Sequence, residues 1–238
     1  MVESIFPLAL RNASVKRKGK VLVGPIDLEL GSNAATAIIG PNGAGKTSLL
    51  RLMHGLERCD SGSVQWAIPD EEARKRQSFV FQTPIIMRRT VLECIAYPLA
   101  IRGAGKGASR NLAAEWGERV GLKDVLRDQA AVLSGGEKQK LALARALVTA
   151  PEVLFLDEPC ANLDGRATRE IEGILSDAVS AGTRIVMATH DMGQARRISN
   201  EVLFLYKGRL HEIERTELFF PSPRTSEAAA FLRGDILE

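Results

Sequence analysis

Apolar and polar positions alternate almost regularly in KVLVGPIDLEL (residues 20–30), a pattern that predicts a half-buried strand. LALRNASVKR (8–17) before it is also strand-like, and TAIIG (36–40) is nearly all apolar, as in a buried strand. A helix is predicted from Lys46 to about His54. The strands predicted in this front part are 8–17, 20–30, 36–40, 61–67 and 77–82.

From residue 83 to about residue 130 the pattern changes to helical spacing around a glycine-rich break, RGAGKGAS (102–109). We interpret this region as an inserted helical subdomain. Strands and helices then alternate, which predicts an α/β fold with a mostly parallel sheet covered on both faces, and a polar tail follows residue 216. The later elements predicted are strands at 153–157, 184–189, 201–206 and 208–213 and helices at 137–149, 166–181 and 192–199.

The composition is that of an ordinary globular protein: of 238 residues, 45% are hydrophobic and 26% charged, and the net charge is +3. This charge is too small to indicate a nucleic-acid partner. Cys59, Cys94 and Cys160 are scattered and have no metal-ligand spacing, so we expect buried thiols in a reducing compartment. We expect neither a signal peptide nor a membrane span, because the start lacks a basic region with a long apolar run and no stretch reaches the length of a spanning helix.

The stretch GPNGAGKT follows the apolar strand and matches the phosphate-loop pattern G-x-x-x-x-G-K-[ST]. Its glycines let backbone N–H groups turn toward phosphate oxygens, and the helix start adds a partial positive charge. Lys46 is predicted to reach the terminal phosphates and Thr47 to ligate Mg²⁺. The alternative is a glycine turn that only joins strand to helix, but the full match in its required context favours the phosphate loop. The nucleotide-binding residues predicted here are Gly40, Pro41, Asn42, Gly43, Ala44, Gly45, Lys46, Thr47 and Ser48.

GAGKGAS (103–109) shares letters with that loop but fails its pattern. Ala100 stands where the first glycine is needed, and Gly107 follows Lys106 where Ser or Thr is needed. No strand precedes it, so we expect a flexible loop.

VLFLDEP (153–159) is a buried strand that ends in two carboxylates. Ligand sites in open α/β sheets lie at the carboxyl ends of strands. Neighbouring side chains there point in different directions, so Asp157 can face Mg²⁺ while Glu158 faces an attacking water. The alternative is a solvated Asp-Glu turn.

Two further residues are weaker candidates when taken alone. His190 follows the strand RIVMAT and could donate a hydrogen bond to the γ-phosphate, although a lone histidine there is more often structural. Gln82 closes SFVFQ, where the helical region begins, and could link the metal or the water to movement of that region, or be an ordinary loop residue.

The stretch AVLSGGEKQKLALARAL (131–147) raises a separate question because it resembles a phosphate loop without the lysine. Ser134 and Glu137 form the S-x-x-E pattern of a capping box, which would start a helix without any ligand. A capping box does not explain two glycines, which cost backbone entropy at a helix start. To an anion, this stretch offers the Ser134 hydroxyl, backbone N–H groups and the helix dipole.

These elements in this order resemble the ATP-binding cassette (ABC) family of ATPases over essentially the whole chain; the most specific part is LSGGEKQ followed by VLFLDEP. The resemblance implies one P-loop NTPase domain with a mostly parallel sheet, an N-terminal antiparallel β subdomain and an inserted helical subdomain. The segments implied are a nucleotide-binding core with the β subdomain (1–82 and 131–215), the helical subdomain (83–130) and a C-terminal tail (216–238).

By position, the resemblance implies that Glu158 is catalytic, with His190, Gln82 and Lys46 beside it, and that ATP and Mg²⁺ are bound. The residues implied on the Mg²⁺ side are Thr47, Gln82 and Asp157. A head-to-tail homodimer is implied, in which each copy completes the other's nucleotide site. The residues implied for that contribution are Ser134, Gly135, Gly136, Glu137 and Asp164.

One departure concerns the base of the nucleotide. The family often places an aromatic residue on the adenine about two dozen residues before the phosphate loop, whereas this chain has Arg17 or a neighbouring lysine there. A guanidinium can stack on a base. We therefore expect weaker discrimination between ATP and GTP than an aromatic residue gives.

VFQTPIIMRRTVLECIAYPLAIRG (80–103) and the tail resemble importer subunits, especially those for oxyanions such as tungstate, molybdate or phosphate. The resemblance implies an ATP-hydrolysing subunit that drives transmembrane permease subunits, with a periplasmic or extracellular solute-binding protein in the same system. It implies a cytoplasmic protein, peripheral on the inner face of the cell membrane, with no nucleic-acid partner. The apolar run 84–87 either docks the permease or belongs to the subdomain's own core.

Other functions stay open at this point. An exporter or lipoprotein-release ATPase subunit would carry the same motifs. A small-molecule P-loop kinase also has GxxxxGKT, but it does not need LSGGE before an Asp-Glu pair, and it should phosphorylate an acceptor rather than water. A non-transport ABC ATPase, such as a repair ATPase, should be stimulated by DNA.

Overall fold

The computed structural model describes residues 4–32 and 35–235, which form two sheets with helices packed around them. The strands are β1 (Leu8–Arg17), β2 (Lys20–Leu30), β3 (Thr36–Ile39), β4 (Ser61–Gln65), β5 (Gln77–Val80), β6 (Val153–Asp157), β7 (Arg184–Ala188), β8 (Glu201–Tyr206) and β9 (Arg209–Arg215). The helices are α1 (Lys46–His54), α2 (Asp70–Lys75), α3 (Val91–Ile101), α4 (Lys106–Arg119), α5 (Gly135–Leu147), α6 (Gly165–Ser180), α7 (Met192–Ile198), α8 (Thr216–Phe219) and α9 (Ser226–Arg233), with 3₁₀ turns η1 (Lys123–Val125) and η2 (Ala130–Val132).

The larger sheet has the strand order β5-β6-β7-β3-β8-β9, and all its neighbouring pairs are parallel except β8 with β9. Strand β3 therefore lies inside the sheet, with β7 on one side and β8 on the other. Because the carboxyl ends of parallel strands meet at one edge, the segments that follow β3, β6 and β7 come together there. This edge collects the phosphate loop, the Asp-Glu pair and the histidine predicted from the sequence.

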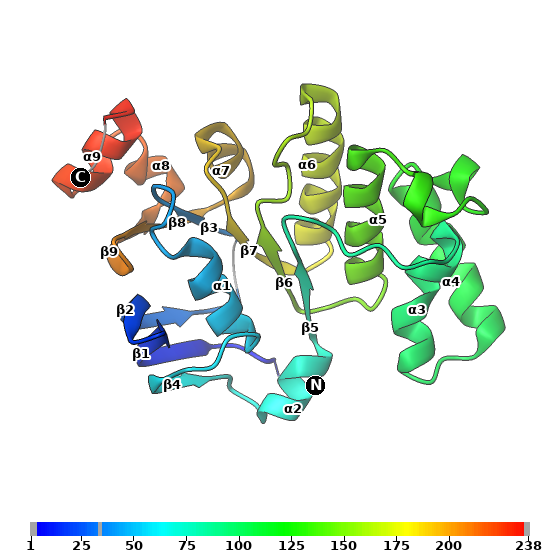
Figure 1. Ribbon diagram of the computed structural model, residues 1–238, viewed down its shortest axis with the longest axis horizontal. Coiled ribbons are helices and arrows are strands. Elements are labelled where there is room, and N and C mark those ends of the chain that lie inside the picture. The colour runs from blue at the N-terminus through cyan, green and yellow to red at the C-terminus, as the bar shows by residue number, and fades with distance from the viewer. Residues whose placement is uncertain (1–3, 33–34, 236–238) are drawn as a thin grey trace.

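The smaller sheet has the order β2-β1-β4 and is antiparallel throughout. Helix α1 contacts strands of both sheets and lies between them, while α6 and α7 pack on the other side of the larger sheet (Figure 1). The expected α/β fold, with a mostly parallel sheet, an antiparallel β subdomain and an inserted helical subdomain, is confirmed. The boundaries assigned to the subdomains stay a prediction.

Helix α1 is held by its apolar face and ends at a glycine. Leu49, Leu50 and Met53 are fully buried, and Gly55 adopts a left-handed conformation with φ 84° that closes the helix. His54, the last helical residue, lies edge-on to Phe79 and Phe155, with ring centroids 5.4 and 5.6 Å away. The end of the phosphate-loop helix is thereby fixed against β5 and β6.

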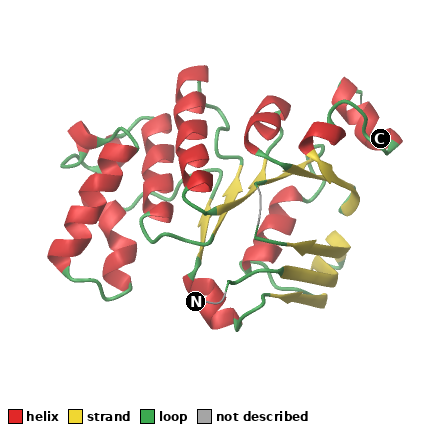
Figure 2. Cartoon of the chain, turned by 180° about the vertical axis from the view of Figure 1, so that it is seen from behind, coloured by secondary structure: helices red, strands yellow, loops and turns green. Residues whose placement is uncertain are grey.

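Helices α3 and α4 form the inserted region at one end of the molecule, opposite the C-terminal helices (Figures 1 and 2). The sequence prediction of a flexible loop over residues 103–109 is wrong in part, because α4 begins at Lys106. The helix includes Gly107, since Ser109 and Ala113 are buried on its inner face and the Ser109 hydroxyl donates to the Ala104 carbonyl at 3.4 Å. Packing here outweighs the low helix propensity of glycine.

The segment after residue 216 is not simply a polar tail. It contains α8 and α9, and Phe219 and Ala228 are fully buried in a cluster with Phe204 of β8. The carboxylate of Glu212 on β9 accepts hydrogen bonds from the backbone N–H of residues 224 and 225 and so fastens the approach to α9. In the described part of the chain, no helix is long and apolar enough to cross a membrane.

Candidate functional site

The phosphate loop connects the end of β3 to the start of α1 and depends on glycine for its shape. A Cβ atom at Gly40 would lie 2.0 Å from the Leu205 carbonyl oxygen of β8, so no side chain fits there. Gly45 precedes the helix with φ 100°, a left-handed conformation that glycine adopts without strain. The first residues of α1, whose backbone N–H groups have no partner within a helix, line a cleft at this edge of the sheet.

The lysine of this loop is folded across it. Lys46 Nζ donates to the carbonyl oxygens of Gly40 at 2.8 Å and Pro41 at 3.1 Å. Burial lowers the pKa of Lys46, and the nearby carboxylates of Glu158 and Asp157 oppose this shift. The ammonium group is thus held over the mouth of the loop, where an anion would meet it.

Thr47 and Asp157 bring two oxygen atoms together beside the loop. The Thr47 hydroxyl donates to Asp157 Oδ1 at 2.8 Å, and burial raises the pKa of Asp157 against the effect of this hydrogen bond. Magnesium prefers oxygen ligands and is usually held by one or two carboxylates together with substrate phosphates and waters. A hydroxyl and a carboxylate in contact, next to a phosphate loop, fit that ion.

Glu158 joins the two weaker sequence candidates. Its Oε2 atom lies 3.2 Å from Gln82 Nε2 and 2.9 Å from His190 Nδ1. Glu158 has a positive φ of 47°, which is uncommon for a residue with a side chain. The backbone thereby turns at the end of β6, and residues predicted from three separate stretches meet at one carboxylate.

A cleft of about 330 Å³ opens over the loop. Its lining includes Leu22 of β2, a residue that the sequence analysis did not identify. An apolar side chain in a strand with alternating polarity gives no local signal of a ligand. Leu22 reaches the cleft only because the two sheets pack against each other. The lining residues are Leu22, Asn42, Gly43, Gly45, Lys46, Thr47, Ser48 and Glu158.

Arg17 is engaged elsewhere. Its guanidinium lies 3.2 Å from Glu57 Oε1, in the segment after α1, and it is absent from the described lining of the cleft. Arg17 is the last residue of β1, and its ion pair with Glu57 holds its side chain beside the end of the phosphate-loop helix. Its contact with the base of a nucleotide stays a prediction.

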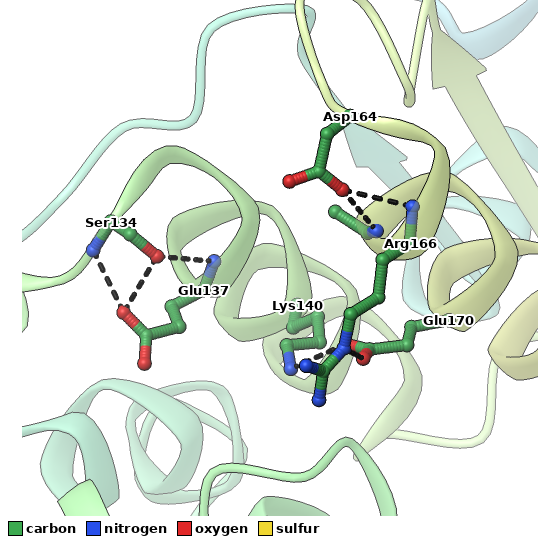
Figure 3. A network of polar contacts seen from close by, with 7 residues as sticks. Ser134, Glu137, Lys140, Asp164, Arg166 and Glu170 are labelled. Carbon is green, nitrogen blue, oxygen red and sulfur yellow. Dashed lines mark hydrogen bonds and ion pairs between the residues drawn. The ribbon is translucent and has the colours of Figure 1, made fainter.

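The start of α5 lies apart from the described lining of the cleft. The capping box predicted there is confirmed: Ser134 Oγ accepts from Glu137 N at 3.4 Å, and Glu137 Oε2 accepts from Ser134 N at 2.8 Å (Figure 3). The Ser134 hydroxyl also donates to Glu137 Oε2 at 2.7 Å, and these hydrogen bonds lower the pKa of Glu137. Asp164 caps α6 nearby by accepting from the backbone N–H groups of Arg166 and Ala167.

Comparisons with known proteins give one consistent result. Residues 23–161 match the protein-family model described as ABC transporter. The chain is 36% identical over 209 residues to a tungstate uptake system ATP-binding protein of Peptoclostridium acidaminophilum, an alignment that covers 87% of this chain and 98% of the relative. It is 34% identical over 248 residues to a phosphate import ATP-binding protein of Natronomonas pharaonis, covering 97% of this chain and 87% of the relative.

A solved structure shows the same likeness. The fold superposes with a TM-score of 0.78 on an ATP-binding cassette in a dimeric post-hydrolysis state bound to ADP and phosphate. The two sequences are 26% identical, and the match covers 88% of this chain and 98% of the other.

Proposed function

The chain belongs to the ABC transporter family and is an ATPase, and from this premise we propose that it powers the import of an oxyanion of the tungstate type through separate permease subunits. The observation that carries the hydrolytic part is the contact of Glu158 with Gln82 and His190, beside Lys46 of the phosphate loop. Such a cluster can both position a water and stabilise charge on a phosphoryl group.

We assign one task to each residue of the cluster. Lys46 and the N–H groups of the phosphate loop bind the terminal phosphates; Thr47 and Asp157 would hold Mg²⁺, which would neutralise charge on the phosphate oxygens. Glu158 accepts a proton from the attacking water. Gln82 and His190 hold the Glu158 carboxylate in place, and His190 is near enough to exchange that contact for one with a phosphate oxygen.

The start of α5 is assigned to the nucleotide of a second copy. Ser134 and its glycines form a helix start without a lysine, so they suit an anion whose charge another loop already neutralises. The likeness to a dimeric ATP-binding cassette supports this arrangement. Two copies related by two-fold symmetry would each contribute Ser134 to the other's site.

The oxyanion and the import direction rest on the names of the relatives, a tungstate uptake protein and a phosphate import protein. The implied partners are permease subunits and a solute-binding protein. The place of the chain is then the cytoplasmic side of the membrane that holds the permease.

Replacing Glu158 with glutamine tests the hydrolytic site. Glutamine keeps the size of the side chain and one acceptor oxygen but cannot take a proton, so we expect ATP binding to be retained and phosphate release to slow by about 10²–10⁴-fold. A turnover within about threefold of the unaltered chain would remove Glu158 from the base role.

The transported solute requires the assembled system. In vesicles that contain the chain with its permease, we expect ATP hydrolysis to rise on addition of the tungstate-loaded solute-binding protein. If the phosphate-loaded protein stimulates hydrolysis instead, the transported oxyanion is phosphate rather than tungstate. ATP-driven movement of solute outward would overturn the proposal of import.

A further inference from the structure

The first turns of α5 and α6 lie close to each other, because Gly136 of α5 faces Ala167 of α6. A Cβ atom at Gly136 would lie 3.2 Å from the Ala167 Cβ atom, which is tighter than ordinary van der Waals contact. At Gly135 the nearest neighbour of such an atom would be Leu163, at 4.0 Å. Gly136, one of the two glycines that the capping box left unexplained, therefore allows one helix start to approach the other.

An ion pair joins the same two helices further along. Lys140 Nζ lies 3.0 Å from Glu170 Oε2, and Arg166 Nε lies 3.0 Å from Glu170 Oε1 (Figure 3). Lys140 and Glu170 are each the sixth residue of their helix, so the two helices run in the same direction in nearly equal register. The ion pair lies roughly 8 Å from both helix starts, at 1.5 Å per residue.

Lys140 is well placed to hold this arrangement. Its side chain is only 13% exposed, and a Cβ atom at Gly121 would lie 3.5 Å from its Nζ atom. The hydrogen bond from Lys140, followed by that from Arg166, lowers the pKa of Glu170, as expected for a carboxylate held in its charged form.

The contribution of the ion pair to holding the two helices together depends on the other contacts between them. Deeper in the molecule, α5 and α6 share an apolar cluster that includes Leu143 and Ile171, which fixes their lower parts. Near their starts, the contact between Gly136 and Ala167 involves only a glycine and a methyl group, with Leu163 beside Gly135. In addition, two parallel helix starts place like partial charges side by side, which favours separation. The ion pair between Lys140 and Glu170 therefore adds a direct connection between the helices at this end.

We propose that Lys140 is a positioning residue whose ion pair with Glu170 holds the starts of α5 and α6 as one rigid unit, so that Ser134 and Asp164 are presented together to a second copy of this chain. This inference rests on the proposed pairing of two copies. It concerns how the pairing surface is assembled and adds no group to the reaction.

The test compares Lys140→Met with Lys138→Met in the full chain, measuring ATP hydrolysis against protein concentration. Methionine keeps most of the length of the side chain, and Glu170 retains Arg166, so the variant removes the link between the helices without leaving a carboxylate alone. Lys138 lies on the same helix and makes no ion pair in the described part of the chain. For Lys140→Met we expect the protein concentration at half-maximal specific activity to rise about fivefold or more, with fluorescent-nucleotide affinity unchanged at low protein concentration.

Lys138→Met should behave as the unaltered chain, and Lys140→Arg should restore pairing because it restores the charge. Equal concentration dependence for Lys140→Met and Lys138→Met would overturn the proposal. If Lys140→Met does not fold, Glu170→Gln removes the same link from the more exposed side and is held to the same outcomes. Ser134→Arg separates this inference from the proposed pairing of two copies. If the Ser134→Arg variant still forms dimers normally on ATP, pairing through α5 is itself wrong. If Ser134→Arg does not form dimers but Lys140→Met does so normally, only the role of Lys140 is overturned.

Discussion

The imidazole of His54 is partly buried at the end of α1, and we expect it to make the stability of the chain fall in mild acid. Its Nδ1 atom is buried without a hydrogen-bond partner in the described structure, and the rings of Phe79 and Phe155 lie edge-on to it. Burial, with a smaller effect from the charge of Arg74, lowers the pKa of His54 to about 4 from its ordinary 6.5. The folded chain therefore resists a proton that the unfolded chain accepts.

The magnitude follows from the difference between these two values. Above pH 6.5 the ring is neutral in both states and costs nothing. As the pH falls below 6.5 the unfolded state gains a proton first, so stability drops until the pH passes below 4 and both states are protonated. This difference in proton uptake amounts to about 2 kcal/mol at pH 5 and about 3 kcal/mol below pH 4.

Urea unfolding at pH 7.5 and pH 5.0, followed by the fluorescence of the two tryptophans, measures this effect. The change in unfolding free energy between the two pH values is compared for the unaltered chain and for His54→Leu, which cannot titrate. We expect the unaltered chain to lose about 2 kcal/mol more than the variant. Equal losses, within about 0.5 kcal/mol, would refute the reasoning because some other group would then carry the acid sensitivity.

Two further predictions concern the nucleotide. Lys46→Ala removes a charged donor from the phosphate loop, and titration with a fluorescent ATP analogue should show affinity reduced by about tenfold or more; affinity within about twofold would contradict the phosphate-loop assignment. Arg17 stands where an aromatic residue is common, and it is paired with Glu57, so KM values for ATP and GTP hydrolysis should be comparable. A preference for ATP of about a hundredfold would contradict a contact between the Arg17 guanidinium and the base.

Spacing along the chain predicted that several candidate residues would lie together, and the structure brings them together. The phosphate-loop pattern follows an apolar strand, and strands that end in polar residues converge at one edge of a parallel sheet, so Lys46, Asp157, Glu158 and His190 could be expected to meet there. Their approach depends on topology, which alternating strands and helices nearly determine.

Features that depend on packing between distant segments were not predictable in the same way. Leu22 reaches the cleft because the smaller sheet packs over the loop, and nothing in its strand indicates this. The tail was predicted to be polar, yet the ring of Phe219 is fully buried in a cluster with Phe204 of β8. The close approach at Gly136 likewise depends on Ala167, a residue on another helix.

The left-handed backbone of Glu158 has a consequence for how its variants should be interpreted. A residue with a side chain in that conformation costs about 1 kcal/mol or more, so the chain gives up stability at the position proposed for catalysis. Glutamine has the same backbone preference and keeps this strain, so a stability change in Glu158→Gln reports on the altered contacts with Gln82 and His190 and on the lost charge beside Lys46 and Asp157. Glycine would relieve the strain while deleting the carboxylate, and its two opposing effects on stability could not be separated.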